Sequence, residues 1–109
     1  MTKQEFIEKL SEIDVELGPL ADQQLTNADY LTIEMVYTYH PVIRNSVGKK
    51  QIAMIYAYGG MGVIRDMVPT AVKAREIEKK LQEVQAQKRN LLAQLEELRT
   101  GKESEVIME

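Results

Sequence analysis

The sequence contains no cysteine, which excludes disulfides, thiol nucleophiles and cysteine-bound metals. No group of its acidic residues and its one histidine has the spacing of metal ligands, and we expect no metal and no cofactor. Its apolar runs fall short of the roughly 18 residues that cross a membrane. The first ten residues carry acids and no apolar stretch, so we expect no signal peptide, and the expected location is the cytoplasm.

The hydrophobic and charged fractions of the sequence are those of an ordinary globular protein. Of the 109 residues, 44% are hydrophobic and 28% are charged, as in a typical globular protein. A chain of this length suits one small domain with an extended appendage. The fold class that the helical periodicities below predict is all-α, with a small N-terminal helical cluster followed by a long C-terminal coiled-coil helix.

The first half of the chain predicts two helices. Thr2 and Glu5 have the spacing of a capping box, and apolar residues recur at helical intervals from there, which predicts a helix from about residue 3 to 12. A connector containing Gly18 and Pro19 follows. Thr26 and Asp29 predict a second helix start. Residues 32–39 are rich in β-branched and aromatic side chains, so a strand is the alternative there.

A glycine-rich stretch, "YAYGGMG", follows the third expected helix, which Asn45 or Ser46 caps. The glycines favour a structural joint, formed by Gly59, Gly60, Gly62 and Pro69, in which Gly59 ends one helix in the left-handed conformation and Pro69 begins the next. The alternative is a phosphate loop. It lacks support because Val63 and Ile64 follow Gly62 where a Walker loop has lysine and Ser or Thr.

The last helix has the clearest pattern. Apolar residues alternate at intervals of three and four, the a and d rhythm of a coiled coil, at Ile77, Leu81, Val84, Leu91, Leu95 and Leu98, with Lys88 at an a position. The register extends back to a positions 67 and 74 and d position 70. From Thr70 to Thr100 no Gly or Pro intervenes, a length of about 46 Å in a helix. We therefore expect a domain over 1–68, a coiled-coil helix over 69–100 that ends at Gly101, and a flexible tail over 101–109.

This helix predicts an oligomer interface formed by Ile77, Leu81, Val84, Lys88, Leu91, Leu95 and Leu98. Lysine at an a position limits the number of strands and favours a homodimer. At the edges, Lys73 of one copy would attract Glu78 of the other, whereas Lys80 would face Gln85. Parallel and antiparallel pairing, and oligomers above the dimer, stay open at this point.

Charge is unevenly distributed along the chain. Residues 1–40 hold two lysines against eight acids, whereas residues 41–80 hold eight basic residues against three acids. The basic middle suggests an anion-binding role as an alternative function, with Arg44, Lys49, Lys50 and Arg65 as contacts. The acidic first part and the absence of a known nucleic-acid motif argue against it, and solvated helix faces explain the charges as well.

The sequence offers no catalytic constellation. His40 is the single histidine, and a general base needs a nucleophile and an orienting acid. Glu34 and Ser46 are present, but no spacing connects them with His40. The sequence therefore predicts no catalytic residues and a protein that is not an enzyme.

The segment from "VYTYHPVI" through "GKKQIAMIYAYGGMGVIRDMVPTAVKAREIEKKL" resembles short uncharacterised accessory proteins of phages and integrated elements of Gram-positive bacteria. His40–Pro41 and the "GGMG" and "DMVPTA" segments carry this resemblance, which covers about half of the chain. It implies an accessory protein in a bacterial host and transfers no catalytic residues. Together with the coiled-coil pattern, it leads us to expect a homo-oligomer that acts by protein–protein contact and inhibits a host protein.

Overall fold

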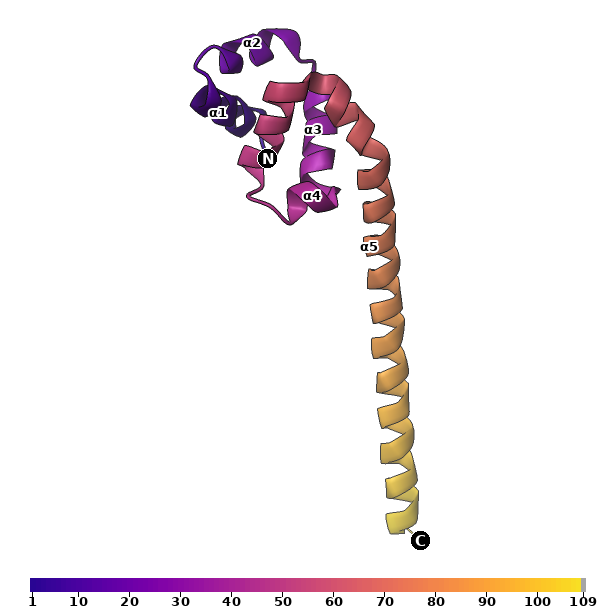
Figure 1. Cartoon of the computed structure of the whole chain (residues 1–109). Coiled ribbons are helices and arrows are strands. Elements are labelled where there is room, and N and C mark those ends of the chain that lie inside the picture. Colours follow the sequence, from indigo (N-terminus) through magenta and orange to yellow (C-terminus); the bar gives the residue numbers. More distant parts are fainter. Residues whose placement is uncertain (109) are drawn as a thin grey trace. The chain divides into compact units, whose positions relative to one another are not determined.

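The structure, a computed structural model, describes the backbone of residues 1–108 and the side chains of residues 1–100. It contains five helices (Figure 1): α1 (Lys3–Ile13), α2 (Leu17–Gln24), α3 (Asn27–Tyr39), α4 (Pro41–Arg44) and α5 (Lys49–Met108). Among these residues all regular structure is helical. The expected all-α fold, a small helical cluster followed by a long helix, is confirmed, and residues 32–39 are helix rather than strand.

The chain divides into two compact units, Met1–Arg75 and Glu76–Glu109. The sequence placed this division after residue 68, but α5 stays in the first unit for longer. Ala71 is fully buried in the core of that unit. The guanidinium of Arg75 lies 5.3 Å from the ring centroid of Tyr39. The first unit therefore includes two helical turns that the heptad pattern had assigned to the coiled coil.

The end of α5 also differs from the expectation. The sequence predicts a stop at Gly101, whereas the backbone of α5 continues to Met108. The flexible tail that we expect over 101–109 stays a prediction, and the side chains of these residues lie outside the described part of the chain.

The first and third helices begin where their caps predict. The Thr2 hydroxyl accepts the backbone N–H of Glu5 at 3.2 Å. At α3 the box is reciprocal: the Thr26 hydroxyl accepts from the Asp29 N–H at 3.2 Å, and the Asp29 carboxylate accepts from the Thr26 N–H at 3.0 Å. Each cap supplies partners for backbone donors that the first helical turn leaves unpaired.

The expected connector between α1 and α3 contains a helix that the sequence did not predict. Gly18 and Pro19, taken as turn residues, lie in the first turn of α2, where proline is tolerated because its missing N–H would have no helical partner. Gly18 is buried, and a Cβ there would lie 2.0 Å from the Ser11 hydroxyl oxygen and 3.0 Å from the Ile7 carbonyl oxygen. The glycine is needed because α1 and α2 approach closely at this point.

All five helices contribute to one core in the first unit. α1 packs against α2, and α3 contacts α4 (Figure 1). Phe6 is 1% exposed, and its ring makes edge contacts with Tyr30, at a centroid distance of 6.1 Å, and with Tyr56, at 5.5 Å. The other fully buried apolar residues are Leu10, Ala21, Ile33, Val36, Ile43, Ile52, Ala53, Ile64 and Ala71. Tyr37 and Tyr56 are partly buried and pack against this core.

The glycine joint exists, but it lies at Gly60. Gly60 has φ 75° and ψ −174° and is the non-helical residue inside α5, a conformation that essentially only glycine adopts. Gly59, which we expected to be left-handed, is not among the residues with positive φ. A Cβ on Gly59 would instead lie 2.6 Å from a methyl of Val63. The bend lets Ile52 and Ile64, on either side of it, enter the same core.

Pro69 does not begin a helix as predicted; it lies inside α5. A proline there leaves the carbonyl four residues earlier, that of Arg65, without its helical donor. Because Pro69 and Arg65 are both exposed, water can bond that carbonyl, and the helix continues.

We expect opposite effects from alanine at two neighbouring glycines. Gly60→Ala should lower the free energy of unfolding by about 1–3 kcal/mol, because a Cβ disfavours this backbone conformation, although nothing lies within 4 Å of that Cβ. Gly62→Ala should raise it by up to about 1 kcal/mol, because Gly62 is helical with open space around it. Urea denaturation of both variants measures the difference. Equal effects would place the bend elsewhere.

Candidate functional site

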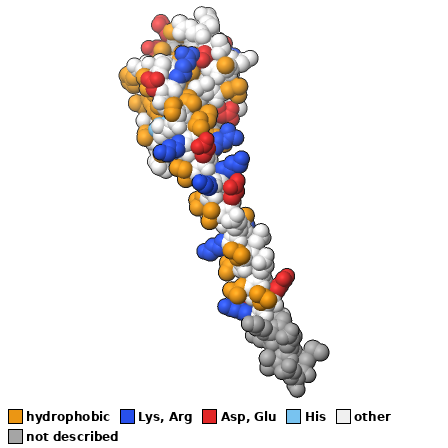
Figure 2. Space-filling view, turned by 90° about the vertical axis from the view of Figure 1, so that its right-hand side faces the viewer, with side chains coloured by type: hydrophobic (Ala, Val, Ile, Leu, Met, Phe, Trp, Pro, Cys, Tyr) orange, Lys and Arg blue, Asp and Glu red, His pale blue; other side chains and the backbone are white. Residues whose placement is uncertain are grey.

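The second unit carries an apolar stripe along its helix. Figure 2 shows hydrophobic side chains in orange along the visible face of this helix, with Lys and Arg side chains in blue between them. The apolar members of the predicted interface are all exposed, from 45% for Leu95 to 64% for Leu91. The others are Ile77, Leu81, Val84 and Leu98. Residues spaced by three and four lie on one face of a helix, so these side chains form a continuous surface.

The stripe begins later than the sequence predicted. The heptad register extended to residues 67, 70 and 74, which belong to the first unit. There the buried residues are Ile64 and Ala71, which occupy e positions, whereas Thr70 is exposed. Beyond the Gly60 bend, the fully buried residues of α5 in the first unit thus lie at e positions and not at a or d positions. The exposed a and d surface of the second unit therefore runs from Ile77 to Leu98.

Two side chains modify the stripe. Lys88 occupies an a position in its middle and is exposed, so the apolar surface is interrupted by one cation. Leu92, at the e position next to Leu91, is 55% exposed and widens the surface near its C-terminal end. We did not predict Leu92, although the Leu91–Leu92 pair in the sequence signals it.

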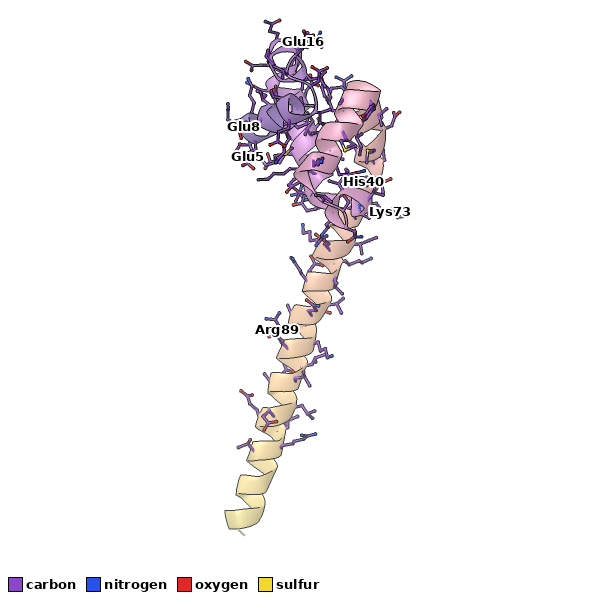
Figure 3. All side chains as sticks on the ribbon, turned by 60° about the vertical axis from the view of Figure 1, so that its left-hand side comes forward. Glu5, Glu8, Glu16, His40, Lys73 and Arg89 are labelled. Carbon is purple, nitrogen blue, oxygen red and sulfur yellow. The ribbon has the colours of Figure 1, made fainter. Side chains whose placement is uncertain are left out.

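The predicted anion contacts do not form one basic site. Lys49 pairs with Glu5 of α1, and an Arg65 nitrogen lies 2.9 Å from an Asp29 oxygen. Lys50 lines a hollow together with Lys9 and Glu12. Arg44 is the last residue of α4. Figure 3 shows Glu5, Glu8 and Glu16 at the first two helices and Lys73 on α5. The acidic and basic parts of the chain thus pair with each other in the fold, which weakens the anion-binding hypothesis.

Asp29 holds two structural roles at once. Its carboxylate accepts the Thr26 N–H and pairs with Arg65. The backbone hydrogen bond from Thr26, followed by the bond from Arg65, lowers the pKa of Asp29 below its ordinary value of 3.8. Both interactions favour the charged carboxylate.

This lowered pKa gives a pH prediction. A carboxyl group whose pKa falls on folding contributes stability that is full above its unfolded pKa, near 3.8, and is lost as the pH falls through its lower folded value. Asp29→Asn should therefore reduce the loss of stability between neutral pH and acid pH. Melting curves of the variant and the parent at several pH values below 5 test this; parallel pH profiles would contradict it.

His40 is a structural residue in this fold. It is 8% exposed and lies between α3 and α4 (Figure 3). Its Nδ1 accepts the backbone N–H of Val42 at 3.3 Å and so caps α4, which Pro41 begins. This contact explains the His40–Pro41 pair without a catalytic role.

Hollows and metal-ligand groups add no second candidate. One hollow of about 450 Å³ lies between α1 and α3 and is mainly apolar, lined in part by Phe6, Tyr30 and Leu31. Within the described part of the chain, no group of three or more histidines and acids could hold a metal ion. The helices in that part include none that is both long enough and apolar enough to cross a membrane.

Comparisons of the chain with family models, with curated proteins and with solved structures find no match. The apolar stripe is therefore the feature on which a functional proposal rests.

Proposed function

We propose that this chain is a non-enzymatic accessory protein that acts by protein–protein contact as a homodimer, joined through the stripe from Ile77 to Leu98. The observation that carries the proposal is the exposure of six apolar side chains in heptad spacing on one face of a helix. Such a surface on a second copy of the same helix is complementary to it, because the knobs of one helix fit the holes of the other.

The energetics of the second unit favour association. Full burial of a Leu, Ile or Val side chain contributes roughly 1.5–3 kcal/mol, and in one copy all six of these side chains are exposed. Intrinsic helix propensity contributes little to the stability of a helix, and most of that stability comes from packing of its apolar face. Pairing would therefore stabilise both the helix and the complex, while Lys88 would disfavour arrangements with more than two strands.

The use that we propose for the dimer is inhibition of a host protein in the bacterial cytoplasm. This step is supported only by the resemblance of residues from Val36 into α5 to phage and mobile-element accessory proteins. Pull-down from a bacterial lysate with the full chain tests it. Recovery of no protein above the level bound by an unrelated helical control would contradict it.

The dimer itself is tested by dilution. We expect light scattering to give twice the 12.5 kDa mass of one chain. The melting temperature should rise with protein concentration, because dissociation of a dimer depends on mass action. A monomer mass, with a melting temperature that stays constant over a hundredfold dilution, would contradict the proposal.

A further inference from the structure

Lys88 distinguishes between the ways in which two copies of the stripe can align. It lies at the central a position, with Leu81, Val84, Leu91 and Leu95 around it along the helix. In a parallel pair without stagger, each residue meets its own copy, so the two lysines share one layer and every other layer from Ile77 to Leu98 is apolar.

Every other alignment spreads the polar defect over two layers. In an antiparallel pair that sets Leu81 against Leu98, a positions face d positions, and each Lys88 faces Leu91 of the other copy. A parallel pair shifted by one heptad sets each Lys88 against Leu81 or Leu95. A polar residue at a single a position therefore specifies the register, because mismatched layers leave two apolar side chains packed against charged ones.

The two lysines tolerate a shared layer because of their length. The methylene stem of lysine lies along an apolar surface while its ammonium reaches water, and the two-fold axis of a parallel pair sends the two stems to opposite edges. The edges themselves offer no like-charged pair: Lys80 meets Gln85, Gln87 meets Leu92, and Gln94 meets Arg99 of the other copy.

We propose, building on the homodimer proposed above, that the second copy binds in parallel and in register, with Lys88 as the residue that sets the alignment. The occupant of the stripe is then the same stripe of an identical chain. As a consequence, both copies of the Met1–Arg75 unit are attached at the same end of the paired helices, so that the dimer presents two copies of one surface to a partner. A partner with two sites would gain from this bivalence.

The absence of cysteine from the chain allows a direct test by single cysteine substitutions. Leu98→Cys and Leu81→Cys are each oxidised alone and then as a mixture, and covalent dimers are measured on a non-reducing gel. In the parallel alignment each variant alone should convert most of its chains to a disulfide dimer, because the paired residues meet at the distance that a disulfide needs. Ala93→Cys, on the opposite face at an f position, is the control and should stay monomeric on the gel.

Each other result overturns part of the proposal. Covalent dimers that form only in the mixture would show an antiparallel pair, which overturns the orientation and leaves the homodimer. A dimer mass in solution without any cross-link at residues 81 or 98 would show that the two stripes do not pair in register. Equal cross-linking at Ala93→Cys would show the same. A monomer mass for the parent chain would reject both this inference and the homodimer.

A fourth variant isolates the role of Lys88. Lys88→Leu makes every layer of the stripe apolar, so the parallel register loses its advantage. With this change in the background, we expect cross-links between residue 81 and residue 98 to appear in the mixture beside those between identical residues. Unchanged linking would mean that another residue sets the alignment.

Discussion

A chain that carries Leu91→Glu and Leu95→Glu will have the mass of a monomer in light scattering. Both side chains lie in the middle of the exposed stripe, and pairing would bury two glutamates from each copy among apolar residues. Burial of an unpaired charge costs several kcal/mol, and the pair would bury four such charges while it also loses the contribution of four leucines. The melting temperature should also lose its dependence on concentration, and helicity should fall because the second unit no longer has a partner.

The matched control is Ala86→Glu with Ala93→Glu. It adds the same two charges per chain at f positions, on the face of the same helix that points away from the stripe, and both alanines are exposed. This variant should keep the dimer mass that we expect for the parent chain. If both double variants remain dimers, the interface lies outside the stripe.

Phe6→Ala should lower the free energy of unfolding of the first unit by about 3–5 kcal/mol, the usual cost of removing a buried phenylalanine ring. Phe6 is 1% exposed and touches the rings of Tyr30 and Tyr56, which come from α3 and α5. Its removal leaves a cavity where three helices meet. Since a domain of this size has a total stability of roughly 4–11 kcal/mol, the variant should be partly unfolded at 37 °C.

Urea denaturation measures this loss, with Val15→Ala as the control. Val15 is 79% exposed, so its truncation should change the stability by less than about 0.5 kcal/mol. A loss below about 1 kcal/mol for Phe6→Ala would show that its ring does not hold α1, α3 and α5 together.

Local signals predicted the parts of the fold that depend on local interactions. The Thr2 and Thr26 caps and the long heptad pattern identified α1, α3 and the second unit, because the responsible hydrogen bonds and spacings lie within a few residues. α2 and α4 were missed because Gly18, Pro19 and Pro41 also suit turns, and the packing of α2 on α1 decides between the two. The bend was expected one residue too early, since a run of adjacent glycines does not reveal which one takes the positive φ.

The candidate site could also be predicted only as far as local patterns in the sequence define it. The heptad spacing identified the residues from Ile77 to Leu98, but not where the first unit ends, because the burial of Ala71 depends on helices distant in sequence. The ion pairs of Lys49 with Glu5 and Arg65 with Asp29 join residues that are 44 and 36 positions apart. No short-range pattern in a single sequence reveals such pairs, so the basic segment looked more available to an anion than it is.

The placement of Ile64 and Ala71 in the core has a consequence for synthesis of the chain. Phe6, Leu10 and Ile33 leave the ribosome first, yet their core also includes Ile64 and Ala71, two fully buried residues beyond the Gly60 bend. The nascent chain therefore holds an open apolar surface until about residue 75 has emerged. A fragment cut at residue 68 would lack Ala71 and the Arg75 contact with Tyr39, so the shortest segment suited to separate expression ends at Arg75.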